Sequence, residues 1–166
     1  MPDLRIRFAT AEDASTIVEF VRGLAAFEHE PLEQVHLTEA DVVRDGFGAR
    51  PLFEVLIAER DGRSLGMALF FPHYSTWEGA AAIYIEDLYV VEDARRDGVG
   101  RALVAAVVRL AVERGNPRVD LAVLDWNPAR GFYARLGFAQ QQEWLPYRLD
   151  GAALRALAGD APAQGA

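Results

Sequence analysis

The distribution of apolar and polar residues along the first half of the chain predicts both strands and helices. Short stretches that alternate in polarity, or are apolar throughout, favour strands, and apolar residues three or four positions apart favour helices. Asp61-Gly62 stands between two apolar runs and is typical of a tight hairpin turn. We therefore expect strands at residues 4–8, 53–58 and 65–71, helices that begin after Thr10 and Thr38, and a loop at residues 72–79.

The second half of the chain predicts a strand, a helix and a further strand in succession. Residues 83–90 are mostly β-branched or aromatic, which favours a strand, and the apolar stripe that follows predicts a helix ending by Gly115. Antiparallel strands followed by one strand-helix-strand crossover describe an α+β fold with a mixed sheet. The remaining elements are expected as strands at residues 119–124 and 144–149 and helices at residues 128–136 and 152–157.

The length of the chain, 166 residues, suits one domain with a full hydrophobic core. We expect this domain to cover residues 1–158. Residues 159–166 are small and polar, and they are expected to form a disordered tail.

A loop that contains two glycines connects the predicted strand at residues 83–90 to the following helix. Gly98 and Gly100 lack side chains, so a ligand can approach their amides closely. The first amides of a helix have no internal partner and carry partial positive charge, which favours an anion such as phosphate. Arginines at positions 95, 96 and 101 add positive charge to the same turn. The loop therefore predicts a site for a phosphate-bearing cofactor.

The spacing of this loop narrows the class of cofactor. The dinucleotide fingerprint requires a third glycine where Leu103 stands, and the chain has no Gly-Lys-Ser/Thr tripeptide of the nucleoside-triphosphate loop. What remains, Arg95-x-x-Gly98-x-Gly100 after a strand, resembles the pyrophosphate loop of the GCN5-related N-acetyltransferases, which bind acetyl coenzyme A. The alternative is an ordinary strand-to-helix turn with solvated arginines.

A second stretch strengthens the resemblance. Asn127, followed by Phe132-Tyr133-x-x-Leu136-Gly137-Phe138, is similar to the last motif of the family, although the spacing from the Asn to the Tyr is one residue shorter. The resemblance implies that the Asn touches the cofactor arm, that the Tyr faces the thioester sulfur, and that a bulge frees two backbone amides of the strand for the cofactor. The cofactor-binding residues it implies are Leu88, Tyr89, Val90, Arg95, Arg96, Asp97, Gly98, Val99, Gly100, Arg101, Asn127 and Tyr133.

Shorter matches point to the diamine and polyamine acetyltransferases and their thialysine-acetylating relatives within this family. These matches include Asp45-Gly46-Phe47-Gly48 and Tyr84-Ile85-Glu86-Asp87. In that group an acid of the strand contacts the amine, which here is Glu86, and an aromatic-acid pair at the end of the first helix lines the pocket. The substrate-binding residues that we expect from this resemblance are Phe27, Glu28, Glu86, Trp77 and Glu143. At the position of Phe27 the group often has tyrosine.

The predicted chemistry follows from these residue types. An alkylamine is protonated near neutral pH and attacks a thioester only when neutral, so we expect Glu86 to attract the ammonium group and to accept its proton through water. Tyr133 is expected to protonate the departing thiolate, in a direct transfer within a ternary complex. The plainer alternatives are that Glu86 is a solvent-facing residue of a strand and that Tyr133 only packs.

Composition sets the remaining expectations. The net charge of −8 argues against a nucleic-acid partner, and the chain has no cysteine, so an acyl-cysteine intermediate is excluded. No run of apolar residues is long enough for a membrane span, no signal is evident at the start of the chain, and the spacing of the histidines suggests no metal site. We expect a cytoplasmic enzyme, and the resemblance implies a homodimer. The alternatives are a non-catalytic acyl-coenzyme-A-binding regulatory module and an acetyltransferase that acts on protein amines or an antibiotic.

Overall fold

The computed structural model describes residues 3–161 of the chain. It divides into two compact units, Met1–Arg130 and Gly131–Ala166, and each is described by itself. The expectation of one domain over residues 1–158 stays a prediction. Of the expected tail, Gly159 ends a helix and residues 162–166 lie outside the described part of the chain.

A five-stranded sheet in the order β1-β2-β3-β4-β5 forms the centre of the first unit. Each strand is antiparallel to its neighbour except β5, which runs parallel to β4, so the predicted mixed α+β sheet is confirmed. The predicted hairpin is also confirmed, with φ of 53° at Asp61 and 75° at Gly62. The strands are β1 (Arg5–Phe8), β2 (Glu54–Arg60), β3 (Arg63–Ser75), β4 (Ala80–Val90) and β5 (Val119–Leu121).

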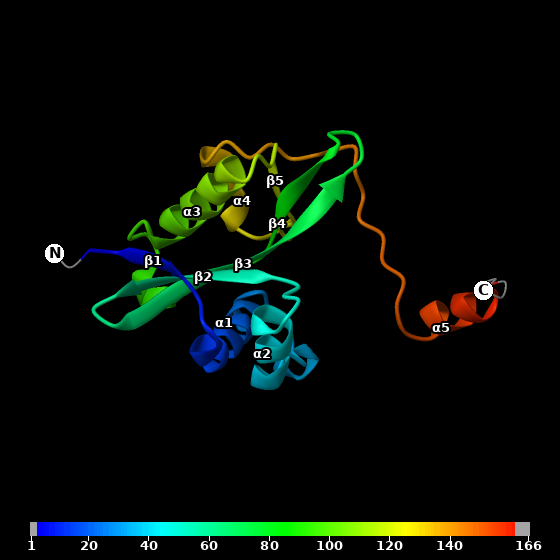
Figure 1. Cartoon of the computed structure of the whole chain (residues 1–166), viewed down its shortest axis with the longest axis horizontal. Coiled ribbons are helices and arrows are strands. Elements are labelled where there is room, and N and C mark those ends of the chain that lie inside the picture. The colour runs from blue at the N-terminus through cyan, green and yellow to red at the C-terminus, as the bar shows by residue number, and fades with distance from the viewer. Residues whose placement is uncertain (1–2, 162–166) are drawn as a thin grey trace. The chain divides into compact units, whose positions relative to one another are not determined.

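Helices cover both faces of this sheet (Figure 1). On one face α1 (Ala14–Phe27) and α2 (Glu39–Phe47) bury Ile17 and Val42 against β2 and β3. On the other face α3 (Val99–Glu113) buries Leu103 against β3 and β4. The 3₁₀ turns are η1 (Ala11–Asp13), η2 (Leu32–Gln34) and η3 (Glu92–Ala94).

The start of α2 is fixed by a cap at Thr38, the residue after which the sequence predicts this helix. The backbone N–H of Asp41 donates to the Thr38 hydroxyl (3.2 Å), and the backbone N–H of Thr38 donates to the Asp41 carboxylate (3.0 Å). These reciprocal bonds satisfy donors that the first turn of a helix leaves without partners.

Strand β4 contains a bulge at Glu86. Phe70 of β3 pairs with Ile85, and Leu69 pairs with Asp87, so Glu86 is an extra residue with no counterpart on β3. Side chains alternate between the faces of a strand, and one extra residue reverses this alternation. As a result, the core under α3 takes up Ile85 before the bulge and Leu88 after it, whereas Asp87 is shifted toward the face covered by α1.

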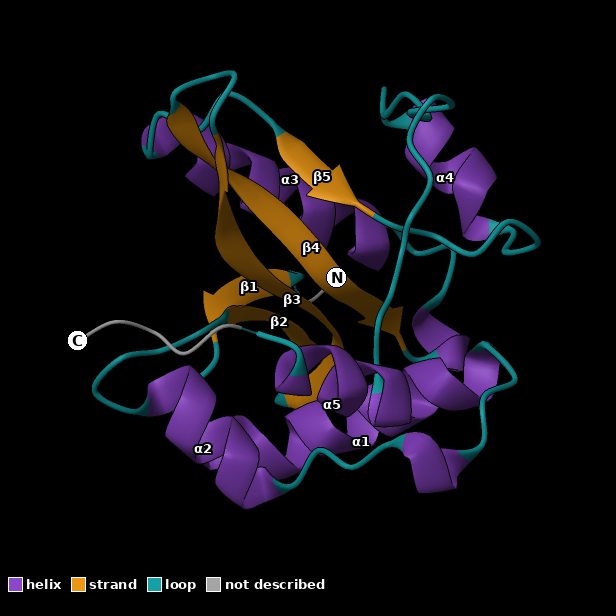
Figure 2. Ribbon diagram, turned by 90° about the vertical axis from the view of Figure 1, so that its right-hand side faces the viewer, coloured by secondary structure: helices purple, strands orange, loops and turns teal. Residues whose placement is uncertain are grey.

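The pairing of β4 with β5 ends beside this bulge. The register runs from Ile83↔Val119 to Ile85↔Leu121, and β4 continues past the end of β5 (Figure 2). Strand β5 is therefore shorter than the predicted 119–124. The two parallel strands stop pairing at this point, and one edge of β4 has no strand partner from Glu86 onward.

The predicted loop at residues 72–79 is wrong in its first half. Strand β3 continues to Ser75, and Pro72 pairs with Ile83 of β4. A proline lacks the N–H needed in the middle of a sheet, but β2 stops pairing with β3 at Glu54↔Phe70. Pro72 thus lies where β3 has become an edge on that side, and the missing donor costs nothing there.

The second unit holds the end of α4 (Ala129–Arg135), which begins in the first unit, and α5 (Gly151–Gly159). The predicted strand at residues 144–149 is wrong, since the structure assigns these residues no regular element. Leu145 and Tyr147 are exposed, and Pro146 between them offers no amide for pairing. None of the helices within residues 3–161 combines the length and the apolar character needed to cross a bilayer.

Candidate active site

The amides of β4 beyond the bulge point toward the open edge. The N–H of Val91 donates to the carbonyl of Leu65 on the β3 side (2.9 Å). Because backbone groups alternate in direction along a strand, the N–H groups of Leu88 and Val90 point the other way, where β5 has ended. Two adjacent donors on an edge without a strand partner suit a carbonyl or amide group of an extended ligand.

The loop after β4 presents a second group of amides. Its backbone turns at Arg96 (φ 73°) and Gly98 (φ 81°), both in the left-handed region. The first internal bond of α3 runs from the N–H of Ala102 to the carbonyl of Gly98 (3.0 Å). The amides of residues 99–101 precede that bond, so they are the donors that a helix start offers to an anion.

Ion pairs tie this loop to the β2–β3 hairpin. Arg63 donates two hydrogen bonds to the Asp93 carboxylate, at 2.7 and 3.0 Å. Arg60 lies 3.9 Å from Asp97, measured from Nη1 to Oδ2. Two separate contacts therefore restrain the loop on both sides of its turn.

The three arginines of the loop differ in what surrounds them. Arg96 and Arg101 are exposed, as expected for phosphate ligands. Arg95 is partly buried, its Nε donates to the carbonyl of Val90 (2.9 Å), and its guanidinium lies over the ring of Phe27 (4.7 Å). In this arrangement the Arg95 side chain is engaged with the protein, and its predicted phosphate contact stays a prediction.

An acidic cluster forms beside the bulge. Burial and, to a smaller extent, the neighbouring charges of Glu86 and Glu28 together raise the pKa of the Asp87 carboxyl from its ordinary value of 3.8 to about 6. Burial also raises the pKa of Glu28, with a smaller contribution from Glu30. The structure thus brings together Glu86 and Glu28, both predicted at the amine pocket, and adds Asp87 to them.

Sequence reasoning did not assign a role to Asp87. A strict alternation along the strand places Asp87 on the face opposite to Glu86. The bulge interrupts this alternation and brings both side chains to the same face. In the sequence, the only sign of a role for Asp87 is that it follows Glu86 directly within a predicted strand.

The loop after β5 reaches the end of α1. The ring of His29, just beyond α1, stacks on Trp126 with ring centres 5.3 Å apart. Next to Trp126, Asn127 is buried and its Oδ1 accepts a hydrogen bond from the N–H of Ala129 (2.8 Å). Asn127 therefore caps the start of α4, and its predicted contact with the cofactor stays a prediction.

Trp77, a predicted substrate-binding residue of the first unit, lies far from the acidic cluster of Glu28, Glu86 and Asp87. It lies in the turn between β3 and β4 and is 89% exposed. From Ala80 to Glu86, β4 extends roughly 20 Å at the usual rise per residue. Trp77 therefore lies at the other end of β4 from the bulge.

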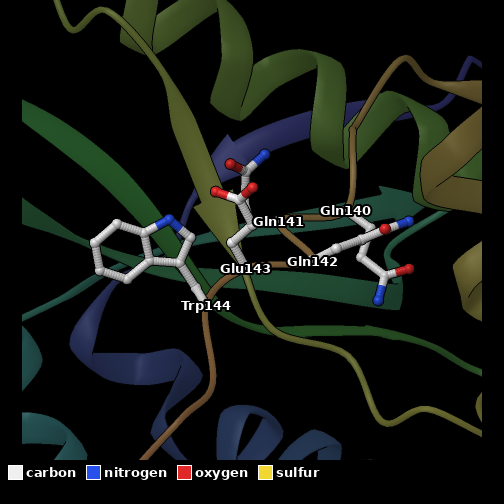
Figure 3. A pocket seen from close by; sticks show the side chains of 5 residues that line it. All are labelled: Gln140, Gln141, Gln142, Glu143 and Trp144. Atoms are coloured by element: carbon white, nitrogen blue, oxygen red, sulfur yellow. The ribbon is translucent and has the colours of Figure 1, made fainter.

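Tyr133 and Glu143 belong to the second unit. The half-buried ring of Tyr133 packs edge-on against Phe132 (5.2 Å) and Phe138 (5.7 Å). Glu143 lines an open pocket of about 330 Å³, formed by the consecutive residues 140–144 (Figure 3). Glu143 is the one charged residue among the five that line it, so within this unit the pocket does not match an acidic amine site.

Comparison with known proteins identifies the family to which this chain belongs. A model of the acetyltransferase (GNAT) family matches residues 14–138, and the chain belongs to that family. It is 37% identical to a thialysine N-epsilon-acetyltransferase of Mus musculus, over 96% of this chain and 99% of the relative. It is 38% identical to an L-ornithine N5-acetyltransferase of Arabidopsis thaliana, over 90% of this chain and 60% of that one. Its fold is similar to that of an integron cassette protein from V. cholerae, with a TM-score of 0.78 and 22% identity over 93% of this chain and 97% of that chain.

The raised pKa of Asp87 predicts a measurable pH dependence of stability. Between about pH 4 and pH 6 the folded protein keeps a proton that the unfolded chain has released, so the free energy of unfolding falls as the pH rises through this range. The substitution Asp87→Asn removes the titrating group and, with it, this fall in the free energy of unfolding. We expect the variant to be more stable than the wild type by about 2–3 kcal/mol at pH 7 and to differ little at pH 3, as measured by urea denaturation.

Glu86→Gln serves as the matched variant for this prediction. It removes a neighbouring negative charge, so the pKa of Asp87, measured by NMR titration of its carboxyl carbon, should fall. Equal stabilities of wild type and Asp87→Asn across the pH range would show that the Asp87 carboxyl is well solvated.

Proposed function

We propose that this protein transfers an acetyl group from acetyl coenzyme A to a primary amine of a small molecule. The observation that carries the proposal is the bulge at Glu86, where the open-edge amides of β4 and an acidic cluster lie next to each other along the strand. The proposed acceptor is a polyamine, a diamine, or a thialysine-, lysine- or ornithine-like amine. This choice is supported by the relatives, which are named for thialysine and L-ornithine.

The acidic cluster suits the binding and activation of an ammonium group. Three carboxyl groups from the end of α1 and from β4, those of Glu28, Glu86 and Asp87, attract a cationic substrate. In the proposed mechanism Glu86 accepts the proton of the ammonium group through water, which leaves a neutral amine to attack the thioester. Asp87, with a pKa of about 6, is suited to share that proton near neutral pH.

The backbone donors suit acetyl coenzyme A. We propose that the amides of Leu88 and Val90 bind the thioester carbonyl and the pantetheine arm, and that the carbonyl oxygen gains stabilisation there as negative charge develops. The amides of residues 99–101, with Arg96 and Arg101, are proposed to bind the pyrophosphate. Tyr133 is proposed to donate its phenolic proton to the departing thiolate. The transfer is direct, so amine and cofactor are bound together when the new amide bond forms.

The experiment that tests this function measures the release of free coenzyme A. Acetyl coenzyme A is supplied with spermidine, putrescine, thialysine, ornithine, lysine or a peptide in turn. We expect turnover on at least one small amine and a loss of about 10²- to 10⁴-fold in kcat for Glu86→Gln and for Tyr133→Phe. Glu113→Gln, an exposed acid at the end of α3, is the control and should keep full activity.

The other outcomes of the same assay identify the alternative functions. Tight binding of coenzyme A without turnover on any amine would identify a non-catalytic regulatory module. Turnover on the peptide alone would identify an acetyltransferase for protein amines, and turnover on an aminoglycoside added to the panel would identify an antibiotic as acceptor.

We also propose that the protein is a homodimer, as its family resemblance implies, and that it acts in the cytoplasm. The dimer is supported by large exposed apolar side chains in the second unit, among them Leu145 (72% exposed) and Tyr147 (93% exposed). Sedimentation velocity should give twice the mass of the chain, and Leu145→Asp with Tyr147→Asp should shift the protein toward the monomer. A wild-type protein that sediments as a monomer at micromolar concentration would contradict the proposed homodimer.

A further inference from the structure

Arg95 lies where three parts of the first unit meet. It follows η3 at the start of the cofactor loop, and its Nε donates to the carbonyl of Val90 at the end of β4 (2.9 Å). The carbon of its guanidinium lies 4.7 Å from the centre of the Phe27 ring and 5.8 Å from that of the Tyr89 ring. Phe27 is the last residue of α1. One side chain therefore connects the loop, the open end of β4 and the end of α1.

These distances are those of favourable cation–π contacts. A guanidinium group is planar and weakly hydrated, so it stacks on aromatic faces without losing much solvation. A separation of up to about 6 Å from the ring centre is within the range in which the attraction is significant. The hydrogen bond to Val90 fixes the orientation of the group, and the guanidinium is partly buried with it.

The ring of Tyr89 provides a fixed support for this contact. It packs against Phe20 of α1, with ring centres 5.4 Å apart. It also passes so close to Gly23 that an added Cβ there would lie 2.5 Å from its hydroxyl oxygen. Tyr89 cannot move toward α1, so Arg95 contacts an aromatic ring whose position is already fixed.

We propose that Arg95 is a positioning residue that couples the cofactor loop to the amine pocket. By holding the ring of Phe27, Arg95 fixes the last turn of α1 and, with it, the next residue, Glu28, whose charge acts on Asp87. Binding of coenzyme A to the loop orders Arg95 and hence the pocket, and binding of the amine orders the loop in return. This reciprocity is required of any coupling between two binding sites. The inference rests on the proposed function, since it names the two sites as those of the cofactor and the amine.

A simpler role for Arg95 makes a different prediction. If its guanidinium leaves Phe27 and binds the pyrophosphate directly, the loss of Arg95 weakens the binding of coenzyme A and leaves the amine pocket unchanged. If Arg95 positions Phe27, loss of either residue impairs the same property, namely the apparent affinity for the amine.

The test is a double-mutant cycle of Arg95→Gln and Phe27→Leu. The leucine keeps an apolar side chain but removes the aromatic face. We expect each single variant to raise the KM for the amine by about three- to thirty-fold, with a smaller change in kcat, as removal of a cation–π contact predicts. The double variant should be no worse than the more impaired single variant, because both remove the same contact. Phe27→Tyr keeps the ring and should restore most of the affinity.

Calorimetry supplies a readout that does not depend on turnover. Coenzyme A should bind more tightly in the presence of the amine, and this enhancement should disappear in both single variants. Arg109→Gln, which removes an exposed arginine on α3, is the control for the lost charge and should keep the enhancement. Arg95→Lys keeps the charge without the planar group and replaces Arg95→Gln should that variant fail to fold.

Two results would overturn the inference. One is strict additivity of the two substitutions in the KM for the amine, and the other is a loss of coenzyme A affinity in Arg95→Gln with an unchanged KM for the amine. If the wild type acetylates no amine, the proposed function fails. The double-mutant cycle can then still be evaluated from the affinity for coenzyme A and from the free energy of unfolding. If the two substitutions have additive effects on these quantities, Arg95 and Phe27 are not coupled and the inference is overturned.

Discussion

The extra residue in β4 at Glu86 is the constraint from which the rest of the site follows. A regular strand there would direct Asp87 into the core under α3, whereas the bulge shifts Asp87 toward the α1 face. The bulge lies where the β4–β5 pairing ends, so the open edge with its outward amides and the acidic cluster occur at the same place on β4.

The acidic cluster has a cost in stability that the sheet and its helices offset. Asp87 is half-buried beside other carboxyl groups, and its raised pKa means that its charged form disfavours the folded state near neutral pH. Such a group is retained where its charge is useful, and an acid with a pKa close to the working pH is well suited to exchange protons. The favourable contacts lie elsewhere, in the two apolar cores on either face of the sheet.

Local signals in the sequence predicted the parts of the fold that depend on local chemistry. The Asp61-Gly62 hairpin, the Thr38 cap and the glycine-containing turn before α3 each depend on a few adjacent residues. The errors arose where pairing with a distant strand decides the outcome. Pro72 continues β3 because β2 has already ended beside it, and residues 144–149 form no strand although they are mostly apolar. Asp87 was missed for the same reason, since no pattern in β4 alone reveals that one of its residues is extra.

Amide hydrogen exchange of β4, resolved residue by residue by NMR, tests this account most directly. If coenzyme A binds at the open edge of β4, saturating coenzyme A slows exchange at Leu88 and Val90, whose amides point to that edge. Exchange at Tyr89, whose amide faces β3, stays unchanged. Equal protection of Leu88, Tyr89 and Val90 before the ligand is added, with no change on binding, would show that the edge of β4 is already occupied. That result would contradict the bulge as the origin of the site.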